Sequence, residues 1–303
     1  MNMFAPGVRV LDCAGRPLAL DRPRVVGIIN VTPDSFSDGG EHASPDAAVA
    51  HGLRMVEEGA DMLDVGGEST RPGASDVSAE EEMSRVIPVI ERLAREVAVP
   101  IAIDTSKPEV MTAAVAAGAG MINDVYALRR EGALDAAAKT GAAVCLMHMQ
   151  GEPRSMQVDP HYDDVVGEVH RFLAERVFAC EMAGIDKRRV TVDPGFGFGK
   201  NLEHNLALLR ALDKLRDLAA GVYVGLSRKS MLGAITGREI PADRVAASVA
   251  AALVAVQRGA VMVRTHDVAA TRDALAVWQA VHAGDPALRP APPAVPAWPD
   301  DDD

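Results

Sequence analysis

The chain repeats one short pattern, first seen at Gly27-Ile28-Ile29-Asn30, in which an apolar run ends in polar residues or glycine. Seven further runs of this kind end near positions 67, 104, 124, 148, 195, 229 and 266. The segments between them are long enough to form amphipathic helices. A strand, a polar loop and a helix repeated in this way predict a (β/α)8 TIM barrel of the α/β class, whose functional site lies at the carboxyl ends of the strands.

An open, doubly wound sheet would also alternate strands with helices. Its nucleotide-binding versions concentrate glycines after the first strand, whereas here polar endings follow every apolar run. The segment Gly195–Lys200 is rich in glycine, but its spacing matches neither the Rossmann fingerprint nor the P-loop. This distribution favours the closed barrel.

The barrel is predicted to be a single domain over residues 24–282, preceded by an N-terminal extension at 1–23. No linker-like composition occurs before residue 283. Residues 283–303 are rich in proline and end in aspartates. A segment of this composition buries little apolar surface, so it is predicted to be a disordered acidic tail.

Composition limits which binding partners and which cellular compartment are expected for the protein. The net charge of -12 over 303 residues makes nucleic acid and anionic membranes unsuitable partners for the surface as a whole. The three cysteines have no metal-ligand spacing and suit a reducing compartment. Residues 1–24 contain no continuous apolar segment, which predicts neither a signal peptide nor a membrane span. A cytoplasmic location is the expectation.

The sequence also predicts where helices begin and which of their faces are buried. Capping boxes are predicted at Ser78–Glu81 and Ser106–Glu109. Apolar residues at helical spacing predict two stripes that cover the sheet. The first stripe is Met83, Val86, Ile87, Ile90 and Leu93, and the second is Val245, Val249, Leu253 and Val256.

The loops after the first two strands carry charged residues between glycines. Asn30 lies where the first strand meets its loop and offers a neutral oxygen to a cation. Asp34 and Asp38 could hold Mg²⁺ or could simply form turns. Arg71 could close over a substrate anion, because guanidinium binds phosphate or carboxylate bidentately, or could be a solvated surface residue.

Three polar residues, Asp104, Asn123 and Asp193, stand at or next to the ends of apolar runs. Each alone could be a turn or cap residue. Three at one rim favour a ligand, because buried carboxylates are costly unless they meet donors. A heterocycle with adjacent N–H groups would supply such donors. Met147 could form an apolar wall for the ring or belong to the core.

Cations follow the last two strands, at Ser227-Arg228-Lys229-Ser230 and Arg264-Thr265-His266-Asp267. Barrels often bind phosphate at these two loops. Arg264 and His266 alternate with Thr265 and are therefore predicted to point to one side. Ser230 is predicted to begin a short helix. No nucleophile elbow or poised cysteine is present, so covalent catalysis is not indicated, and His148 is interpreted as structural.

Taken in order, these endings resemble the dihydropteroate synthases, the folate-pathway family targeted by sulfonamides. The resemblance covers roughly residues 24–280 and rests on motifs of high combined specificity. The motifs are N-V-T-P-D-S-F-S-D-G-G from Asn30, D-V-G-G-E-S-T-R-P-G from Asp64, I-D-T from Ile103, N-D from Asn123, D-P-G-F-G-F-G-K from Asp193, S-R-K-S from Ser227 and R-T-H-D from Arg264.

The resemblance implies a reaction and a role for each site residue. The family condenses 6-hydroxymethyl-7,8-dihydropterin pyrophosphate with p-aminobenzoate and releases pyrophosphate, by a largely dissociative substitution. Implied pterin-binding residues are Asp104, Asn123, Met147, Asp193 and Lys229. Implied pyrophosphate-binding residues are Asn30, Arg71, Arg264 and His266, with Asn30 near Mg²⁺. The implied p-aminobenzoate pocket comprises Phe36, Thr70, Pro72, Phe198 and Ser230.

The implied catalytic groups are Lys229, Arg264 and His266, together with Asp38 facing the pterin methylene cation. The family also implies a homodimer. Two other functions stay open. A methyltetrahydrofolate-binding methyltransferase barrel would share the ring-reading carboxylates but would not need Arg71, Arg264 and His266 for pyrophosphate. A catalytically silent paralogue would keep the barrel and bind a pterin or a protein partner.

Overall fold

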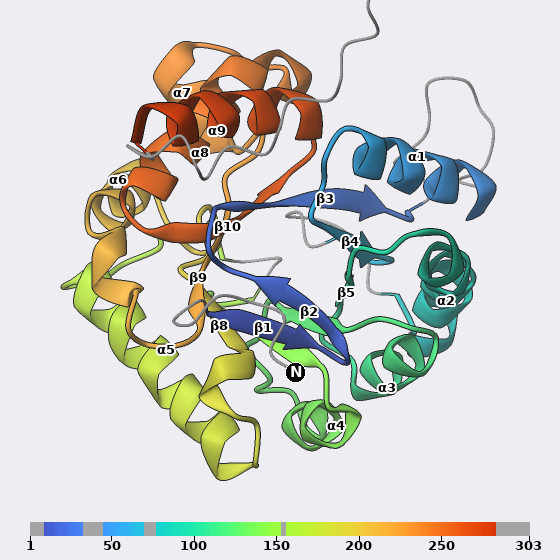
Figure 1. The fold of residues 1–303 in the computed structure, drawn as a ribbon. Coiled ribbons are helices and arrows are strands. Elements are labelled where there is room, and N and C mark those ends of the chain that lie inside the picture. Colours follow the sequence, from blue (N-terminus) through green and yellow to red (C-terminus); the bar gives the residue numbers. More distant parts are fainter. Residues whose placement is uncertain (1–8, 33–44, 70–76, 153–155, 283–303) are drawn as a thin grey trace, which may run out of the picture.

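The computed structural model describes residues 9–32, 45–69, 77–152 and 156–282 (Figure 1). Within these residues, parallel strands close into one barrel in the order β10-β3-β4-β5-β6-β7-β8-β9. The strands are β3 (Arg24–Asn30), β4 (Met62–Gly66), β5 (Ile101–Asp104), β6 (Met121–Asp124), β7 (Ala143–Met147), β8 (Val190–Asp193), β9 (Gly221–Gly225) and β10 (Ala260–Thr265). The predicted (β/α)8 barrel is confirmed, and each predicted ending lies at the carboxyl end of a strand.

Helices form a ring outside the barrel (Figure 1). They are α1 (Pro45–Glu57), α2 (Ala79–Glu96), α3 (Pro108–Ala116), α4 (Ala133–Thr140), α5 (Val165–Met182), α6 (Leu202–Arg210), α7 (Ser230–Thr236), α8 (Val245–Gln257) and α9 (Val268–His282). Short 3-10 turns are η1 (Lys187–Arg189), η2 (Leu212–Leu215) and η3 (Pro241–Arg244). Among the described helices, none is long and apolar enough to cross a lipid bilayer.

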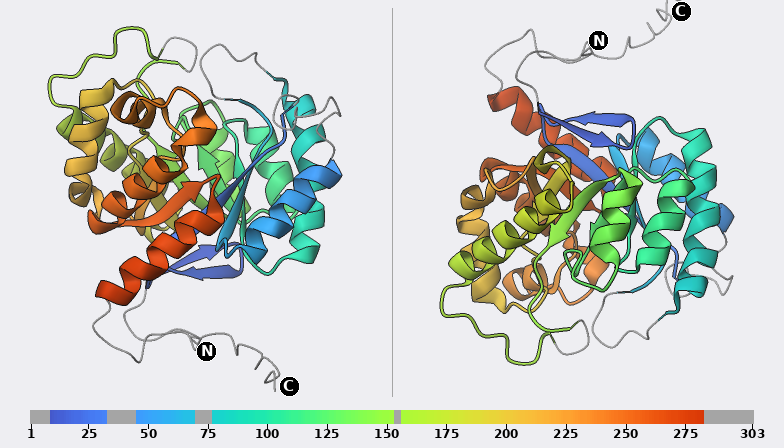
Figure 2. Two further views of the ribbon diagram at one scale, coloured as in Figure 1. Left: turned by 90° about the horizontal axis from the view of Figure 1, so that it is seen from above. Right: turned by 90° about the horizontal axis from the view of Figure 1, so that it is seen from below.

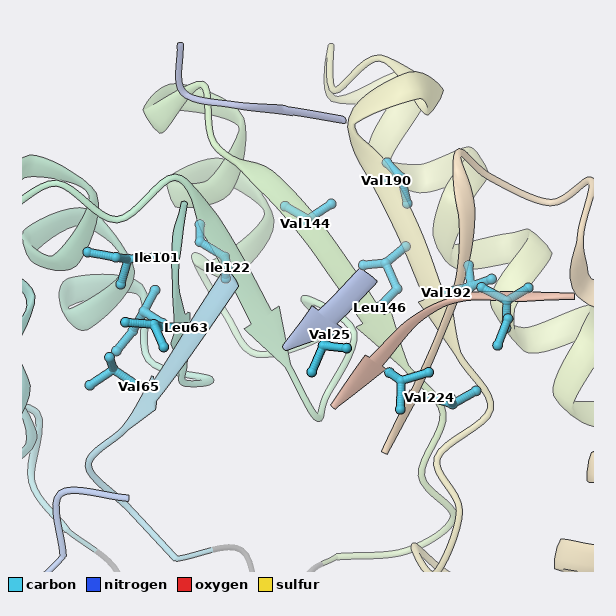
Figure 3. Close-up of a cluster of buried hydrophobic side chains, with 14 of the residues drawn as sticks. Val25, Leu63, Val65, Ile101, Ile122, Val144, Leu146, Val190, Val192 and Val224 are labelled. Carbon is cyan, nitrogen blue, oxygen red and sulfur yellow. The ribbon is translucent and has the colours of Figure 1, made fainter. Parts of the chain in front are cut away.

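The strands are buried on both faces, as their nearly continuous apolar composition predicts. One set of side chains, including Leu63, Val65, Val144 and Leu146, packs against the helices (Figure 3). The alternate set, including Met62, Cys145 and Tyr223, fills the inside of the barrel. Because side chains alternate along a strand, this division also decides which polar residue faces the interior.

Helix α2 starts as the sequence predicts. The Ser78 hydroxyl accepts a hydrogen bond from the Glu81 N–H, although the Glu81 carboxylate binds Arg85 rather than closing the box. Val86, Ile90 and Leu93 are buried, and Met83 and Ile87 are half-buried beside them. Sequence reasoning identified this face of the helix correctly.

Two of the helix predictions were wrong in detail. Helix α3 is not capped by Ser106, because Lys107 is its N-cap residue and makes no side-chain cap, with Pro108 at the first helical position. On α8 the buried face consists mainly of the small residues Ser248, Ala251, Ala252 and Ala255. Of the predicted stripe only Val256 is fully buried. Small side chains allow this helix to approach β10 and α9 closely. The size of the side chains, rather than their hydrophobicity, therefore determines which face of α8 is buried.

The described part of the N-terminal extension forms an antiparallel hairpin of β1 (Val10–Cys13) and β2 (Arg16–Ala19). It lies across the amino end of the barrel (Figure 1), and Figure 2 shows it at one end of the molecule from the side. Leu11, Cys13 and Leu18 are buried with the interior residues of the strands. The hairpin therefore plugs the barrel at the end opposite the polar strand endings.

Candidate active site

Four strand ends meet in one hydrogen-bonded network at the carboxyl end of the barrel. The Arg264 guanidinium on β10 donates from Nε to Asp64 Oδ2 on β4 at 2.5 Å and from Nη2 to Asp104 Oδ2 on β5 at 2.9 Å. Asn123 on β6 donates from Nδ2 to the same Asp64 oxygen at 3.1 Å. The network brings together Asp104, Asn123 and Arg264, which the sequence analysis singled out separately, through Asp64, which it did not.

Charge balance explains how these groups tolerate burial. Burial alone would lower the pKa of Arg264, but the carboxylates of Asp64 and Asp104 raise it above its usual value. Burial raises the pKa of Asp104, while Arg264 opposes the shift and Asp64 adds to it. When both carboxylates are ionised the group carries a net negative charge, and a ligand edge that presents N–H donors would stabilise that state.

A second group lies at the ends of β8 and β9. Asp193 is buried, and its Oδ1 accepts the Gly195 N–H at 2.7 Å. Burial raises the pKa of Asp193 to about 6. The Lys229 ammonium lies 4.2 Å from the centre of the Phe198 ring, and burial lowers its pKa to about 8 against the attraction of Asp193. This group therefore combines a carboxylate, a cation and an aromatic face.

The two groups act on each other electrostatically. Arg264 lowers the pKa of Asp193, and both Arg264 and Asp104 influence the pKa of Lys229. Such coupling between ionisable groups requires them to be close in a poorly solvated space. The structure thus brings Asp104, Asn123, Asp193, Lys229 and Arg264 close together at the carboxyl end of the barrel.

One side of the site is apolar. Met147 is buried in a cluster with Val125, Tyr126, Met149 and Met156, against which Phe198 packs. Thioether and aromatic surfaces of this kind suit the face of a flat ring. From the sequence, Met147 could be either an apolar wall for a bound ring or a core residue. In the structure it pairs with Asp193 in the register of β7 and β8, so its cluster lies beside that carboxylate.

The cationic segments divide between ligand-facing and structural roles. His266 Nδ1 lies 3.0 Å from the Ser227 hydroxyl, so the two endings meet. Arg228 instead binds Asp267 through both Nε and Nη2, which makes it a structural link between the loops rather than an anion ligand. Thr265 is buried against Thr271 of α9, which agrees with the predicted alternation along β10. Ser230 begins α7, as predicted.

Lys200 is a structural residue that sequence reasoning missed. Its buried ammonium contacts His148 Nδ1 at 2.9 Å and the carbonyl oxygens of Phe198 at 2.9 Å and Gly195 at 3.0 Å. Burial lowers the pKa of Lys200 to about 7 and that of His148 to about 2. Together they fasten the 195–199 loop to the end of β7, which supports the structural interpretation of His148.

The same loop depends on a glycine. Gly195 has a positive φ of 70°, and a Cβ at this position would lie 1.9 Å from the His148 carbonyl oxygen. No side chain fits so close to another backbone. The glycine-rich motif therefore serves close packing of the loop that carries Phe198.

Asn30 is the last residue of β3 and is half-buried, and its side-chain amide carries a hard neutral oxygen. Among the described residues, no group of three or more His, Cys, Asp or Glu side chains could hold a metal ion. An amide oxygen suits Mg²⁺, which often binds through few protein ligands and completes its shell with substrate phosphates and water.

Several predicted site residues lie outside the described residues, together with the predicted acidic tail. They are Asp34, Phe36, Asp38, Thr70, Arg71 and Pro72. The roles assigned to them stay predictions from the sequence.

A closed parallel barrel with charged residues gathered at the carboxyl ends of its strands is the architecture of an α/β-barrel enzyme. Residues 26–266 match the family described as pterin binding enzyme. The dihydropteroate synthase of Escherichia coli (strain K12) is 52% identical over 270 residues, which span 89% of this chain and 95% of the relative.

Solved structures agree with the sequence match. The dihydropteroate synthase of Xanthomonas albilineans with 4-aminobenzoic acid superposes with a TM-score of 0.87 at 66% identity, covering 91% of this chain and 99% of that chain. The same enzyme in complex with 7,8-dihydropteroate gives a TM-score of 0.81 at 61% identity over the same shares. The chain belongs to the dihydropteroate synthases within the pterin-binding enzyme family.

Proposed function

We propose that this protein is an enzyme that joins 6-hydroxymethyl-7,8-dihydropterin pyrophosphate to p-aminobenzoate, giving 7,8-dihydropteroate and pyrophosphate. The observation that carries the proposal is that hydrogen-bond acceptors suited to a heterocyclic ring lie next to an arginine suited to pyrophosphate. Asp104, Asn123 and Asp193 supply acceptors, and Arg264 reaches into the same space. Relatives solved with 4-aminobenzoic acid and with 7,8-dihydropteroate support the substrate and product.

The pterin is held by complementarity of donors and acceptors. Carboxylates accept two parallel N–H bonds, which suits the amino-pyrimidine edge of a pterin. Asp193 is the main candidate for this contact. One of its oxygens accepts the Gly195 N–H, but a carboxylate has about four acceptor sites, so it can still accept N–H bonds from a ring beside Lys229. Asn123 retains an amide oxygen and one N–H beyond its bond to Asp64. Met147 supplies an apolar face to the ring.

The reaction is a substitution at the pterin methylene carbon. The carbon–oxygen bond to pyrophosphate breaks, and the electron pair leaves with the pyrophosphate oxygen. The aniline nitrogen then forms the new bond to carbon and loses one proton. Positive charge on the methylene carbon is stabilised by the conjugated ring, so the protein mainly binds, orients and excludes water.

Arg264 and His266 are proposed to bind the departing pyrophosphate, and Arg71 to join them. Arg264 remains charged because Asp64 and Asp104 raise its pKa. Asn30 is the proposed protein ligand of Mg²⁺. Bound Mg²⁺ would neutralise charge that develops on the leaving oxygens.

The p-aminobenzoate site is proposed at the rim beside Lys229. Phe198 offers an aromatic face there, and Ser230 opens α7 next to Lys229. Phe36, Thr70 and Pro72 are proposed to complete this site, and Asp38 to face the methylene cation. These last assignments rest on the family resemblance alone.

The test is release of pyrophosphate from the dihydropterin substrate, measured with and without p-aminobenzoate and with a chelator. Release that needs Mg²⁺ and gives dihydropteroate only with the amine supports the proposal. Tight pterin binding without release would indicate the silent paralogue. Methyl transfer from methyltetrahydrofolate, assayed in parallel, would indicate the methyltransferase barrel.

We also infer a cytoplasmic homodimer. Exposed apolar side chains lie on neighbouring elements in the last part of the barrel, namely Ile235 on α7, Ile240 just before η3, Val254 on α8 and Val277 and Val281 on α9. A second copy of the chain would cover such a surface. Sedimentation equilibrium of the wild type and of Val277→Glu tests this, with a shift toward monomer expected for the variant.

A further inference from the structure

We propose that Asp64 is a positioning residue for the pterin substrate, which orients Asn123 and Arg264 from beneath the site. The inference rests on the proposed function, because its effect is read on the pterin. Asp64 has no exposed surface, so it does not meet solvent. It acts through the two residues that it binds.

The position of Asp64 follows from the register of the barrel. Asp64 pairs with Ala102 on β5, whereas Gly66 pairs with Asp104. Leu63 and Val65 face the helices, so Asp64 faces the barrel interior together with Met62. Asp64 therefore lies one inward-facing layer below Asp104, where it forms the floor of the polar network.

The first consequence concerns Asn123. A carboxylate accepts hydrogen bonds and does not donate them. The bond from Asn123 to Asp64 Oδ2 therefore requires the amide nitrogen to point down and the amide oxygen to point elsewhere. Asn123 is thereby set to offer an acceptor and one remaining N–H to a ring above it. Without Asp64 the amide could turn over and present the wrong pattern.

The second consequence concerns Arg264. Its Nε is bound by Asp64 and its Nη2 by Asp104. Two carboxylates on different strands hold the plane of the guanidinium, and Nη1 is the part of the fork committed to neither. The orientation of this nitrogen decides where a pyrophosphate oxygen can be bound. Asp64 thus couples ring reading by Asn123 to anion binding by Arg264.

The bonding of Asp64 is incomplete with respect to the protein. Both of its strong contacts fall on Oδ2, while Oδ1 and the nearby Tyr223 hydroxyl have no hydrogen-bond partner among the described residues. A buried carboxylate that served stability alone would have both oxygens bonded. Asp61, just before the same strand, has that arrangement with Arg22, Arg24 and the Val25 N–H.

Asp64→Asn is the test variant, and Asp61→Asn is its matched control. Both remove a carboxylate charge, from the middle of β4 and from the residue before it, and both conserve volume. For Asp64→Asn we expect the KM of the pterin pyrophosphate substrate to rise about 10- to 100-fold, as for other residues that orient a ligand-binding group. Its KM for p-aminobenzoate should stay within about twofold. Asp61→Asn should lower the melting temperature and leave both KM values unchanged.

Calorimetry with a phosphate-free pterin gives a readout that does not need turnover. Weaker binding by Asp64→Asn than by the wild type supports the inference even if the wild type releases no pyrophosphate, which would defeat only the proposed reaction. If Asp64→Asn does not fold, Asp64→Glu keeps the charge but displaces it, and weaker pterin binding is again expected.

A folded Asp64 variant with unchanged pterin KM and affinity would overturn the inference. Equal increases in both KM values would do the same, because they would indicate a general loss of structure. Failure of both Asp64 variants to fold would assign Asp64 to stability and also overturn it.

Discussion

Asp61 lies just before β4 and Asp64 lies in the middle of that strand, and both bind arginines, yet their surroundings differ. At the amino end, Asp61 accepts bonds on both oxygens from Arg22, Arg24 and the Val25 N–H. Burial alone would raise the pKa of Asp61, but these partners hold it below its usual value. Toward the carboxyl end, Asp64 has its partners among the described residues on Oδ2 alone. The amino end satisfies its charges within the chain, whereas the carboxyl end keeps polar capacity for a ligand.

The same contrast extends to the rest of each end. The amino end is closed by the hairpin, whose apolar side chains complete the core. The carboxyl end gathers Asp104, Asp193, Lys229 and Arg264, whose pKa values are all shifted by burial or by one another. Stability and function are therefore separated along the barrel axis, and mutations can test the separation.

The largest expected effect is on stability at the amino end. Leu11→Ala removes a fully buried side chain of the hairpin and should lower the free energy of unfolding by about 2–5 kcal/mol. The kcat/KM of the folded variant should be unchanged. Urea denaturation and steady-state kinetics measure the two quantities. A folded variant with much reduced kcat/KM would break the proposed separation of the two ends.

The next effect is on binding at the carboxyl end. Asp193→Ala leaves pterin N–H donors unpaired and should weaken pterin binding by about 2–4 kcal/mol, measured by calorimetry. Above about pH 6 the variant should not be less stable than the wild type, because burial disfavours the charged form of Asp193 in the folded protein and the substitution removes that charge. Unchanged pterin affinity would remove Asp193 from the site.

A pH profile sharpens the electrostatic side of the comparison. Asp193 must be ionised to accept N–H bonds, so kcat/KM for the pterin substrate should fall about tenfold per unit as pH drops below about 6. Lys229 must be protonated to act as a cation, so kcat/KM should fall again as pH rises above about 8. Lys229→Arg keeps its charge at higher pH and should move only the alkaline limb. An alkaline limb that does not move would exclude Lys229 as its origin.

Much of the fold was predictable because parallel strands and their endings depend on local composition. Eight apolar runs ended where the strands end, since a strand buried on both faces admits few polar residues before its loop. The hairpin was not predictable in this way. Its strands have four residues each and include Arg16 and Pro17, and contact with the barrel interior stabilises them. Tertiary packing, rather than propensity, selects that segment.

The site was predictable only for residues at the strand ends. Asp104, Asn123, Asp193 and Arg264 came together because neighbouring strands bring their ends to one rim. Asp64 was missed because it stands inside the apolar run, two residues before the strand ends. Its signal was a charged residue among Met62, Leu63 and Val65, which is costly unless paired.

Other outcomes depended on contacts between distant segments. Arg228 belonged to a cationic run, but Asp267 binds it from the next loop. Lys200 is held by carbonyl oxygens and by His148, which become neighbours only after folding. Asp124 follows Asn123 but accepts the Tyr126 and Leu128 N–H groups of its own loop. Residue type alone does not distinguish such structural partners from ligand-binding ones.

The smallest expected effect is on stability, at the starts of two helices. The predicted N-cap of α2 agrees with the structure, whereas the predicted N-cap of α3 does not. Ser78→Ala removes the bond to the Glu81 N–H and should lower the free energy of unfolding by about 1 kcal/mol. Ser106→Ala should cost less, because Lys107 rather than Ser106 is the N-cap of α3 and no side chain caps that helix. Thermal and urea denaturation of the two variants give the comparison directly. A larger loss for Ser106→Ala would mean that the hydroxyl of this buried serine stabilises the fold through a contact other than a helix cap.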